Sequence, residues 1–284
     1  MLVGAHLSSA GNFVRAAENA VALGLDCVQH FTRNPRGGRQ RRVAEPEATR
    51  YREVRSAHGP GVVVMHAPYT VNLASTESRV REFARSTLVE DMERCRFLDV
   101  PYLVVHPGSH GGRGMDRAAE LVVEGLSEVL SAAEGNREYP MLLLEMMSGA
   151  GNEFGSTPGE LATVFDAMGW PDRLGLCIDT CHSFARGYPL DRPRGLDSYL
   201  GEIDDLLGLV RLKVVHLNDS ALPSGSLRDR HARMGRGKIG ERGLRGIINH
   251  PILRDLPFIL EVPVDSEEDY ADEAALVRSW GEPG

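Results

Sequence analysis

Short apolar runs alternate along this chain with amphipathic segments. Each run is nearly continuous and rich in Val, Ile and Leu, which is typical of parallel strands that are covered on both faces. The predicted strands are Leu2–Ala5, Leu25–Phe31, Val62–Met65, Tyr102–Val105, Met141–Leu144, Leu174–Ile178, Val210–Val215 and Phe258–Leu260.

The segments between these runs have helical periodicity. At one of them Thr157, Pro158 and Glu160 form a clear start signal, an N-cap followed by proline at the first helical position. Eight strand–helix units in 284 residues match the size of a (β/α)₈ barrel. We therefore expect an α/β protein with a single (β/α)₈ TIM-barrel domain over residues 1–284. The predicted helices are Ala10–Leu23, Glu47–Ala57, Ser75–Leu98, Asp116–Ala133, Pro158–Met168, Ser198–Leu207, Leu244–Asn249 and Glu267–Trp280.

The composition is that of a globular protein, with 42% apolar residues. No apolar run has the roughly 20 residues that a membrane span needs, and the first residues lack the features of a signal peptide. The four cysteines form no Cys-x-x-Cys pair and are too few for a disulfide framework. We therefore expect a cytoplasmic protein without a membrane partner.

The charge of the chain is acidic overall but has a local basic excess. Forty acidic residues against 32 basic ones give a net charge of −8, which argues against a generally basic nucleic-acid-binding surface. Five arginines nevertheless fall close together in one predicted loop, and such a run is most often a solvated loop. They are Arg33, Arg36, Arg39, Arg41 and Arg42.

Histidine or an acidic residue stands at the end of every predicted strand. In a barrel all strands run the same way, so their carboxyl ends meet on one face, where the active sites of this fold lie. A single histidine at such a place is most often structural, but eight chemically active residues are poorly explained that way. Crowded carboxylates would repel each other unless cations lay between them. The residues are His6, His30, His66, His106, Glu145, Asp179, His216 and Glu261.

Further candidate ligands follow two of these strands. His182 lies three residues after Asp179, and Asp229 and His231 lie in the loop after the seventh strand. The candidate set then exceeds what one tetrahedral ion can use, so it favours two or three ions that share a bridging carboxylate. Mixed imidazole and carboxylate ligation favours Zn²⁺ over Mg²⁺ or Ca²⁺, with Mn²⁺ or Fe²⁺ as alternatives. Such a cavity would attract an anionic phosphate, which indicates phosphoester hydrolysis.

Other residues near this set leave two interpretations open. Cys177 and Cys181 flank Asp179, but nitrogen and oxygen ligands are plentiful, so we interpret both as small buried residues. His6, His30 and His110 could orient ligands or phosphate, or could make ordinary core or surface hydrogen bonds.

Four motifs make the chain resemble the endonuclease IV family of apurinic/apyrimidinic endonucleases, which are trinuclear-zinc (β/α)₈ enzymes of base-excision repair. The resemblance extends over nearly the whole chain, from Gly4 to Glu261. Each motif is short, but the four are highly specific in this order. They are His106-Pro107-Gly108-Ser109-His110, Cys177-Ile178-Asp179-Thr180-Cys181-His182, His216-Leu217-Asn218-Asp219 and Asp229-Arg230-His231.

The resemblance implies three zinc ions per chain, with Mn²⁺ substitution possible, and a substrate of double-stranded DNA that contains abasic sites. The implied reaction is hydrolysis of the phosphodiester on the 5′ side of the abasic site, which leaves a 3′-hydroxyl and a 5′ deoxyribose phosphate. It implies Glu145 and Glu261 as catalytic residues, with Glu145 bridging two ions. The implied ligands are His66, His106 and Glu145 for the first ion, Asp179, His216 and Glu261 for the second, and His182, Asp229 and His231 for the third.

The resemblance also implies a set of DNA contacts. Arg36 and Tyr69 would insert into the duplex, and Arg230 would hold the backbone beside the metal ligands. The other arginines of the run would contact phosphates. The chain departs from the family pattern at Gly37-Gly38, at Met146-Met147 after the strand-end glutamate, and at Arg236 in place of an acidic residue.

Two other functions fit parts of the pattern. A metal-dependent TIM-barrel sugar isomerase or epimerase uses the same fold, but the many histidine ligands and the Asp229-Arg230-His231 loop weigh against it. A DNA-binding protein with decayed catalysis would be expected to lack ligands, and none is missing. We expect a monomer.

Overall fold

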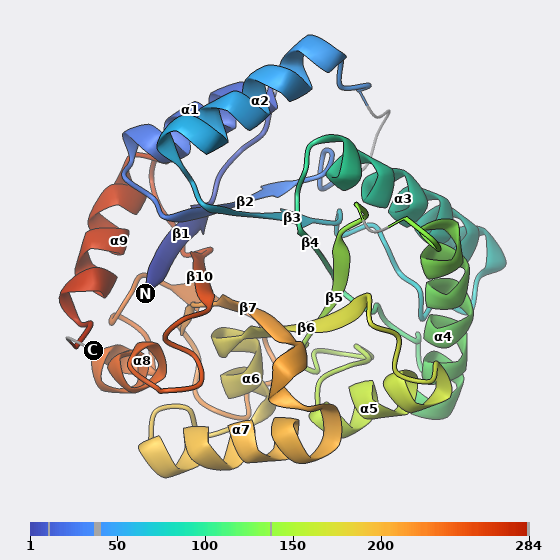
Figure 1. Ribbon diagram of the computed structural model, residues 1–284. Coiled ribbons are helices and arrows are strands. Elements are labelled where there is room, and N and C mark those ends of the chain that lie inside the picture. The colour runs from blue at the N-terminus through green and yellow to red at the C-terminus, as the bar shows by residue number, and fades with distance from the viewer. Residues whose placement is uncertain (11, 37–40, 137, 283–284) are drawn as a thin grey trace.

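The structure is a computed structural model that describes residues 1–10, 12–36, 41–136 and 138–282. Within those residues eight parallel strands close into a barrel in the order β1-β10-β7-β6-β5-β4-β3-β2, as Figure 1 shows in a view along the barrel axis. The predicted TIM-barrel fold is therefore confirmed. The strands are β1 (Leu2–His6), β2 (Cys27–Phe31), β3 (Val62–His66), β4 (Tyr102–Val105), β5 (Met141–Glu145), β6 (Leu174–Asp179), β7 (Leu212–His216) and β10 (Pro257–Leu260).

Helices surround the barrel on the outside (Figure 1), and none in the described ranges is long and apolar enough to cross a membrane. The outer helices are α1 (Phe13–Ala22), α2 (Glu45–His58), α3 (Ser78–Phe97), α4 (Met115–Ala132), α5 (Pro158–Ala167), α7 (Pro193–Leu207), α8 (Gly240–Ile248) and α9 (Asp269–Ser279). A shorter helix and a small antiparallel pair lie at the carboxyl ends of the strands. These elements are α6 (Thr180–Arg186), β8 (Asp219–Ser220) and β9 (His231–Ala232), and a 3₁₀ turn, η1 (Leu209–Arg211), precedes β7.

The structure differs from the sequence prediction mainly at element boundaries. Helix α1 begins at Phe13 rather than Ala10, because the Asn12 side chain accepts from the Val14 amide and caps the helix there. Helix α7 begins at Pro193 rather than Ser198, since proline is suited to the first helical turn. Helix α6 and the β8–β9 pair were not predicted. With seven residues or fewer, they are too short for a periodic pattern.

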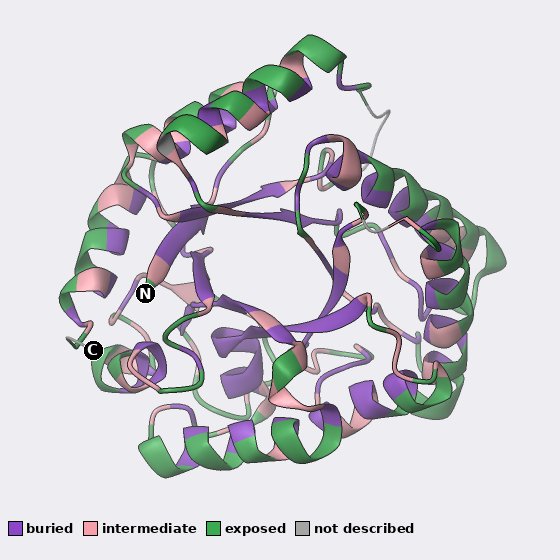
Figure 2. Ribbon diagram, in the orientation of Figure 1, coloured by how far each residue is buried: buried purple, intermediate pink, exposed green. Residues whose placement is uncertain are grey.

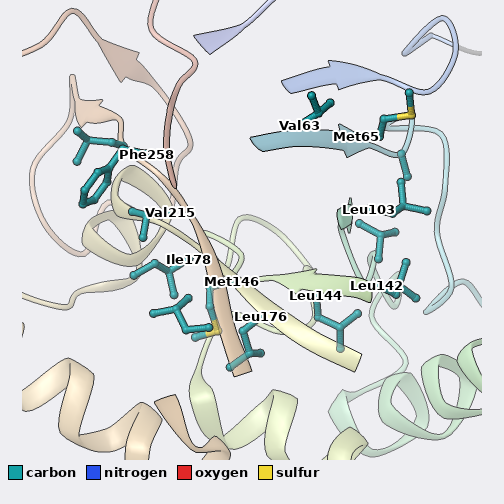
Figure 3. Close-up of a cluster of buried hydrophobic side chains, with 14 of the residues drawn as sticks. Val63, Met65, Leu103, Leu142, Leu144, Met146, Leu176, Ile178, Val215 and Phe258 are labelled. Atoms are coloured by element: carbon teal, nitrogen blue, oxygen red, sulfur yellow. The ribbon is translucent and has the colours of Figure 1, made fainter. Parts of the chain in front are cut away.

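Two apolar layers hold the barrel together. The larger layer lies between the strands and the helices, where Figure 2 shows the helices buried on their inner sides. Figure 3 shows part of it, with Val63, Leu103, Leu144, Leu176 and Val215 from neighbouring strands. The smaller layer fills the inside of the barrel and comprises Cys27, Val64, Val104, Leu143, Cys177, Val214 and Ile259.

The alternation of side chains along each strand connects the inner layer with the polar end of the barrel. Successive side chains point to opposite faces of a strand, so the residue two places after an interior residue also points inward. Two places after Val64, Leu143 and Val214 stand His66, Glu145 and His216. The apolar interior therefore ends at the carboxyl ends of the strands in a ring of polar side chains.

Candidate metal centre

A cavity of about 350 Å³ opens at the carboxyl ends of the strands. The structure brings all nine of the predicted ligand residues together at this end of the barrel, in groups whose nitrogen and oxygen atoms lie within 4.8 Å of one another. Seven of the nine line the cavity, while Asp179 and His216 are fully buried beside it. Three of these groups match the three sets that the resemblance implies. They are His66, His106 and Glu145; Asp179, His216 and Glu261; and His182, Asp229 and His231.

Glu145, at the end of β5, joins the first two groups. Its Oε2 lies 3.1 Å from Nε2 of both His66 and His106. Its Oε1 lies 3.1 Å from Nδ1 of His216 and 3.3 Å from Nδ1 of His182. The side chain is 1% exposed, so its two oxygens can serve two adjacent cation positions without competition from solvent.

The remaining ligands continue the centre toward β7 and the β8–β9 pair. His216 Nδ1 lies 3.5 Å from Glu261 Oε2 and 3.9 Å from Asp179 Oδ2. His231 Nε2 lies 3.0 Å from Asp229 Oδ1. His182 Nε2 lies 3.4 Å from the other oxygen of Asp229, so this carboxylate lies between two imidazoles.

Helix α6 explains the position of His182. Asp179 ends β6 and caps α6, since its Oδ1 accepts from the His182 amide at 2.8 Å. The other oxygen, Oδ2, accepts from the Asn218 side-chain amide at 2.6 Å. Asn218 also accepts from the Glu261 amide at 2.8 Å, so it holds two ligand-bearing segments in place.

Backbone carbonyls orient three of the histidines. Nδ1 of His66 lies 2.6 Å from the Ala67 carbonyl, and Nδ1 of His182 lies 3.0 Å from the Met146 carbonyl. Nδ1 of His231 lies 2.9 Å from the Glu261 carbonyl. A carbonyl oxygen only accepts, so each Nδ1 carries the hydrogen and each Nε2 of a neutral ring presents a lone pair to the cavity.

The charges of the centre are strongly coupled. Burial disfavours the negative charge of Glu145, but the charges of His216 and His106 outweigh this cost and hold its pKa well below the ordinary range. Burial also disfavours the imidazolium of His231, but the carboxylates of Asp229 and Asp179 raise its pKa to about 9. Burial lowers the pKa of His66 despite its contact with Glu145.

These observations fit a cation-binding site. Neutral His66, with its Nδ1 hydrogen on the Ala67 carbonyl, points the Nε2 lone pair at Glu145 Oε2. Two lone pairs at 3.1 Å repel each other unless a proton or a cation lies between them. The lowered pKa of His66 disfavours the proton, so a cation satisfies this pair best. Mixed nitrogen and oxygen donors are the ligands of zinc-type ions.

The structure shows different surroundings for the three histidines whose roles the sequence left open. His6 lies at the centre, with Nδ1 3.0 Å from Glu261 Oε1. His30 faces the outer layer, where it lies against the Leu7 carbonyl and packs against Phe13. His110 accepts from the Gly114 amide in the loop after β4. Only His6 of these three therefore contacts a candidate ligand in the described structure.

Gln29 and Asn218 are the residues that sequence reasoning missed. Gln29 is fully buried, and its side chain contacts both His216 and Glu261. The alternation could have found it, since Gln29 stands two residues after the interior residue Cys27. Asn218 stands in a quoted motif, but its role depends on contacts that only the fold creates.

The predicted DNA contacts lie around the mouth of the cavity. Tyr69 is 61% exposed and its ring packs edge-on against Phe31 and His66. Arg36 is exposed in the loop after β2, where its amide donates to the Asn34 side chain. Arg230 is exposed between two ligand residues. All three side chains are thus available at the open end of the barrel.

Another arginine of the run, Arg33, is already paired inside the protein, which corrects the expectation that it contacts phosphate. The Arg33 side chain is only 8% exposed and donates through Nε to Asp91 Oδ1 at 3.0 Å, while Thr32 donates to the other oxygen. Arg41 pairs with Glu47 at the surface but is half exposed, and Arg42 is exposed, so phosphate contacts by these two arginines stay predictions. Arg33 therefore anchors the base of this loop on α3. The remaining positions of interest, Gly37, Gly38 and Arg39, lie outside the described residues.

Of the other departures from the family pattern, Arg236 is exposed in the loop after β9. Met146 and Met147 are buried, and Met146 packs on the outside of the barrel with Leu176 (Figure 3), so neither methionine lines the cavity. Cys177 is in the interior layer, and Cys181 Sγ lies 3.9 Å from Asp229 Oδ1. Burial raises the pKa of the Cys177 thiol to about 12, which favours the interpretation of this cysteine as a buried apolar residue.

Comparison with known proteins agrees with this geometry. Residues 17–280 match the family model described as "Xylose isomerase-like TIM barrel". A probable endonuclease 4 of Moorella thermoacetica is 41% identical over 281 residues, which are 98% of this chain and 98% of that protein. The crystal structure of endonuclease IV from Thermus thermophilus has 40% identity and a TM-score of 0.87, and covers 99% of this chain and 98% of its own.

A D-tagatose 3-epimerase-like protein shares the fold at 19% identity and a TM-score of 0.72, over 99% of this chain and 97% of its own. Fold and site thus define a protein of the xylose isomerase-like TIM-barrel class. Within this class, the relatives that match over nearly the full length of the chain identify its family. The chain belongs to the endonuclease IV family.

The apparent affinity of the centre for Zn²⁺ should rise with pH through the neutral range. In the metal-free protein His231 holds a proton below pH 9, and the pKa values of His182 and His216 are raised well above the ordinary range. An ion must displace these protons, so each unit of falling pH should cost about tenfold in affinity per proton displaced. Chelator competition between pH 6 and pH 8 measures this, and an unchanged affinity would contradict it.

Asp91→Ala should lower the free energy of unfolding by about 3 kcal/mol, because it removes the only buried carboxylate that the described structure places against the Arg33 guanidinium and leaves it the Thr87 carbonyl and the half-exposed Glu90. Urea denaturation in the presence of chelator measures this without a contribution from bound metal. The control is Glu124→Ala, which removes a half-exposed partner of Arg85 and should cost no more than about 1 kcal/mol. Equal losses in the two variants would contradict a buried anchor.

Proposed function

We propose that this protein is a zinc-dependent DNA-repair endonuclease that hydrolyses the phosphodiester 5′ to abasic sites in double-stranded DNA. The observation that carries this proposal is the convergence of nine ligand-type side chains in three adjacent groups, with seven of these side chains lining one cavity. Membership of the endonuclease IV family supports the same reaction. The products would be a 3′-hydroxyl and a 5′ deoxyribose phosphate.

The three groups would hold three zinc ions, with Mn²⁺ as a possible substitute. When bound, such ions acidify water and stabilise the charge that develops on a phosphodiester during in-line displacement. The cavity lining contains no arginine or lysine among the described residues, so the charge that attracts phosphate must come from the ions.

The residues of the chain would bind and orient the reacting groups. Glu145 and Glu261, our candidate catalytic residues, present carboxylate oxygens at the first two groups, where either can accept a proton or direct a hydrogen bond from water. Their lowered pKa values, which histidine charges cause against the effect of burial, keep both carboxylates ionised at neutral pH.

The side chains at the mouth would recognise the damaged duplex. Tyr69 offers an exposed ring beside the first ligand group, and Arg36 and Arg230 offer exposed guanidinium groups. Insertion of Arg36 and Tyr69 into the duplex would help to turn the abasic nucleotide out toward the cavity. Arg230 would contact a phosphate between the ligands Asp229 and His231.

Three further properties belong to this proposal. The cysteines of the chain are all free and buried, which supports a cytoplasmic location. The exposed large apolar side chains of the described residues are distributed over several elements, which supports a monomer. We further propose that residues 1–284 form one catalytic domain, since the barrel closes between β1 and β10, the first and the last of its strands.

The sugar epimerase alternative is less well supported. The epimerase structures resemble this chain in fold at low identity, and fold alone does not define a reaction. The third ligand group, which contains Asp229 and His231, goes beyond the one or two ions that such an enzyme would need. A bound-metal count close to three per chain would favour the endonuclease.

Duplex DNA with a single abasic analogue should be nicked on the 5′ side of the lesion, and chelator should abolish the reaction. Glu145→Gln should also abolish cleavage, because a neutral amide cannot bridge two cations as a carboxylate does. The matched control is Glu124→Gln on the outer surface, which should cleave like the parent. Cleavage that persists in Glu145→Gln would remove Glu145 from the mechanism.

Arg36→Ala should weaken binding to abasic DNA by about tenfold or more while it changes binding to undamaged DNA much less. The reason is that an inserted side chain acts only where the duplex is damaged, whereas a phosphate contact acts everywhere. The control is Arg254→Ala, an exposed arginine just before β10 at the opposite end of the barrel. Fluorescence anisotropy with both duplexes measures the ratio, and equal losses would make Arg36 an ordinary phosphate contact.

A further inference from the structure

In four of the candidate ligand histidines, one ring nitrogen faces the centre and the other has a hydrogen-bond partner in the described structure. Of these four, His216 has its ring turned the opposite way from the rest. His66, His182 and His231 direct Nδ1 to backbone carbonyls and Nε2 to the cavity. His216 directs Nδ1 to the carboxylates of the centre, Glu145 and Glu261. Its Nε2 points toward β2, where the partner is a side chain rather than the backbone.

That partner is Gln29. Its Oε1 lies 2.9 Å from His216 Nε2, and its Nε2 donates to Glu261 Oε1 at 2.7 Å. The same amide nitrogen lies 2.9 Å from Nδ1 of His6, which is itself 3.0 Å from Glu261 Oε1. Gln29 and His216 are both fully buried, so water cannot replace either contact.

The chemistry of the amide fixes its orientation. Turned over, the amide would place its oxygen against a Glu261 oxygen at 2.7 Å, where two acceptors repel each other. In the observed orientation the amide oxygen can only accept, so His216 Nε2 must carry the hydrogen. The neutral ring then presents the Nδ1 lone pair to the centre, as a metal ligand must.

We propose that Gln29 is a positioning residue that sets the tautomer of His216 and the rotamer of Glu261, and thereby defines the second cation site. Through its two polar atoms, one side chain holds two of the three ligands of that site, Asp179 being the third. In the described structure the Gln29 side chain makes no hydrogen bond to a ligand of the first or third group. The proposal rests on the proposed metal centre.

The test is Gln29→Met, which keeps the length and volume of the side chain but removes its polar contacts with His216, Glu261 and His6. The control is His30→Met, the same substitution one residue further along β2, where the side chain faces the outer layer. Both variants are compared with the zinc-loaded parent by native mass spectrometry in rising chelator concentration. Thermal unfolding in excess chelator confirms that both fold without metal.

We expect Gln29→Met to lose one ion at 10- to 100-fold lower chelator concentration than the parent, so that a two-ion species accumulates. His30→Met should lose its ions as the parent does. A Gln29→Met protein that retains all ions like the parent, or loses all of them together, would overturn the proposal. If Gln29→Met fails to fold, Gln29→Glu decides: it keeps an acceptor for His216 but repels Glu261, and should also release one ion early.

Zinc binding by the parent protein distinguishes a failure of the proposed function from a failure of the role proposed for Gln29. If the parent binds no zinc at all, the proposed function fails, whatever the variants do. If the parent binds three ions and Gln29→Met matches it, the proposed function stands and only the role of Gln29 is rejected.

Discussion

The structure depends on the compensation of the negative charge of Glu145, a buried carboxylate. An isolated carboxylate in such a place would be protonated, since burial disfavours its charge. Here imidazoles of four histidines, from β3, α6, β7 and the position just after β4, surround its two oxygens at 3.1–3.3 Å. Because those elements are far apart in the sequence, the charge of Glu145 links distant parts of the barrel at one point.

The strands make this convergence possible through their two-residue repeat. Each strand that supplies a ligand first places an apolar side chain in the interior layer and then, two residues later, a polar one above it. The interior layer therefore forms an apolar base beneath the ligands. It excludes water from below, so the electrostatic interactions of the centre are stronger than they would be in solvent.

The sequence predicted the barrel and the strand-end ligands because both depend on local repeats. It did not reveal Gln29, because the neighbouring His30 is the more reactive residue type and was therefore the candidate at the end of this strand. Only the register shows that His30 points outward. The sequence also could not predict the Arg33–Asp91 ion pair, because the two residues are 58 positions apart and meet only when the loop after β2 packs against α3. Contacts between distant segments have no local pattern from which to predict them.

The charges of the centre explain why a chain with a net charge of −8 can act on DNA. Four carboxylates, those of Glu145, Asp179, Asp229 and Glu261, belong to the centre, and no arginine or lysine in the described structure lines the cavity. Without cations this cavity would repel a phosphodiester. Three divalent ions would bring six positive charges against four negative ones and so reverse the sign. The exposed arginines at the mouth can then guide the duplex from outside, while access of phosphate to the reacting position depends on metal loading.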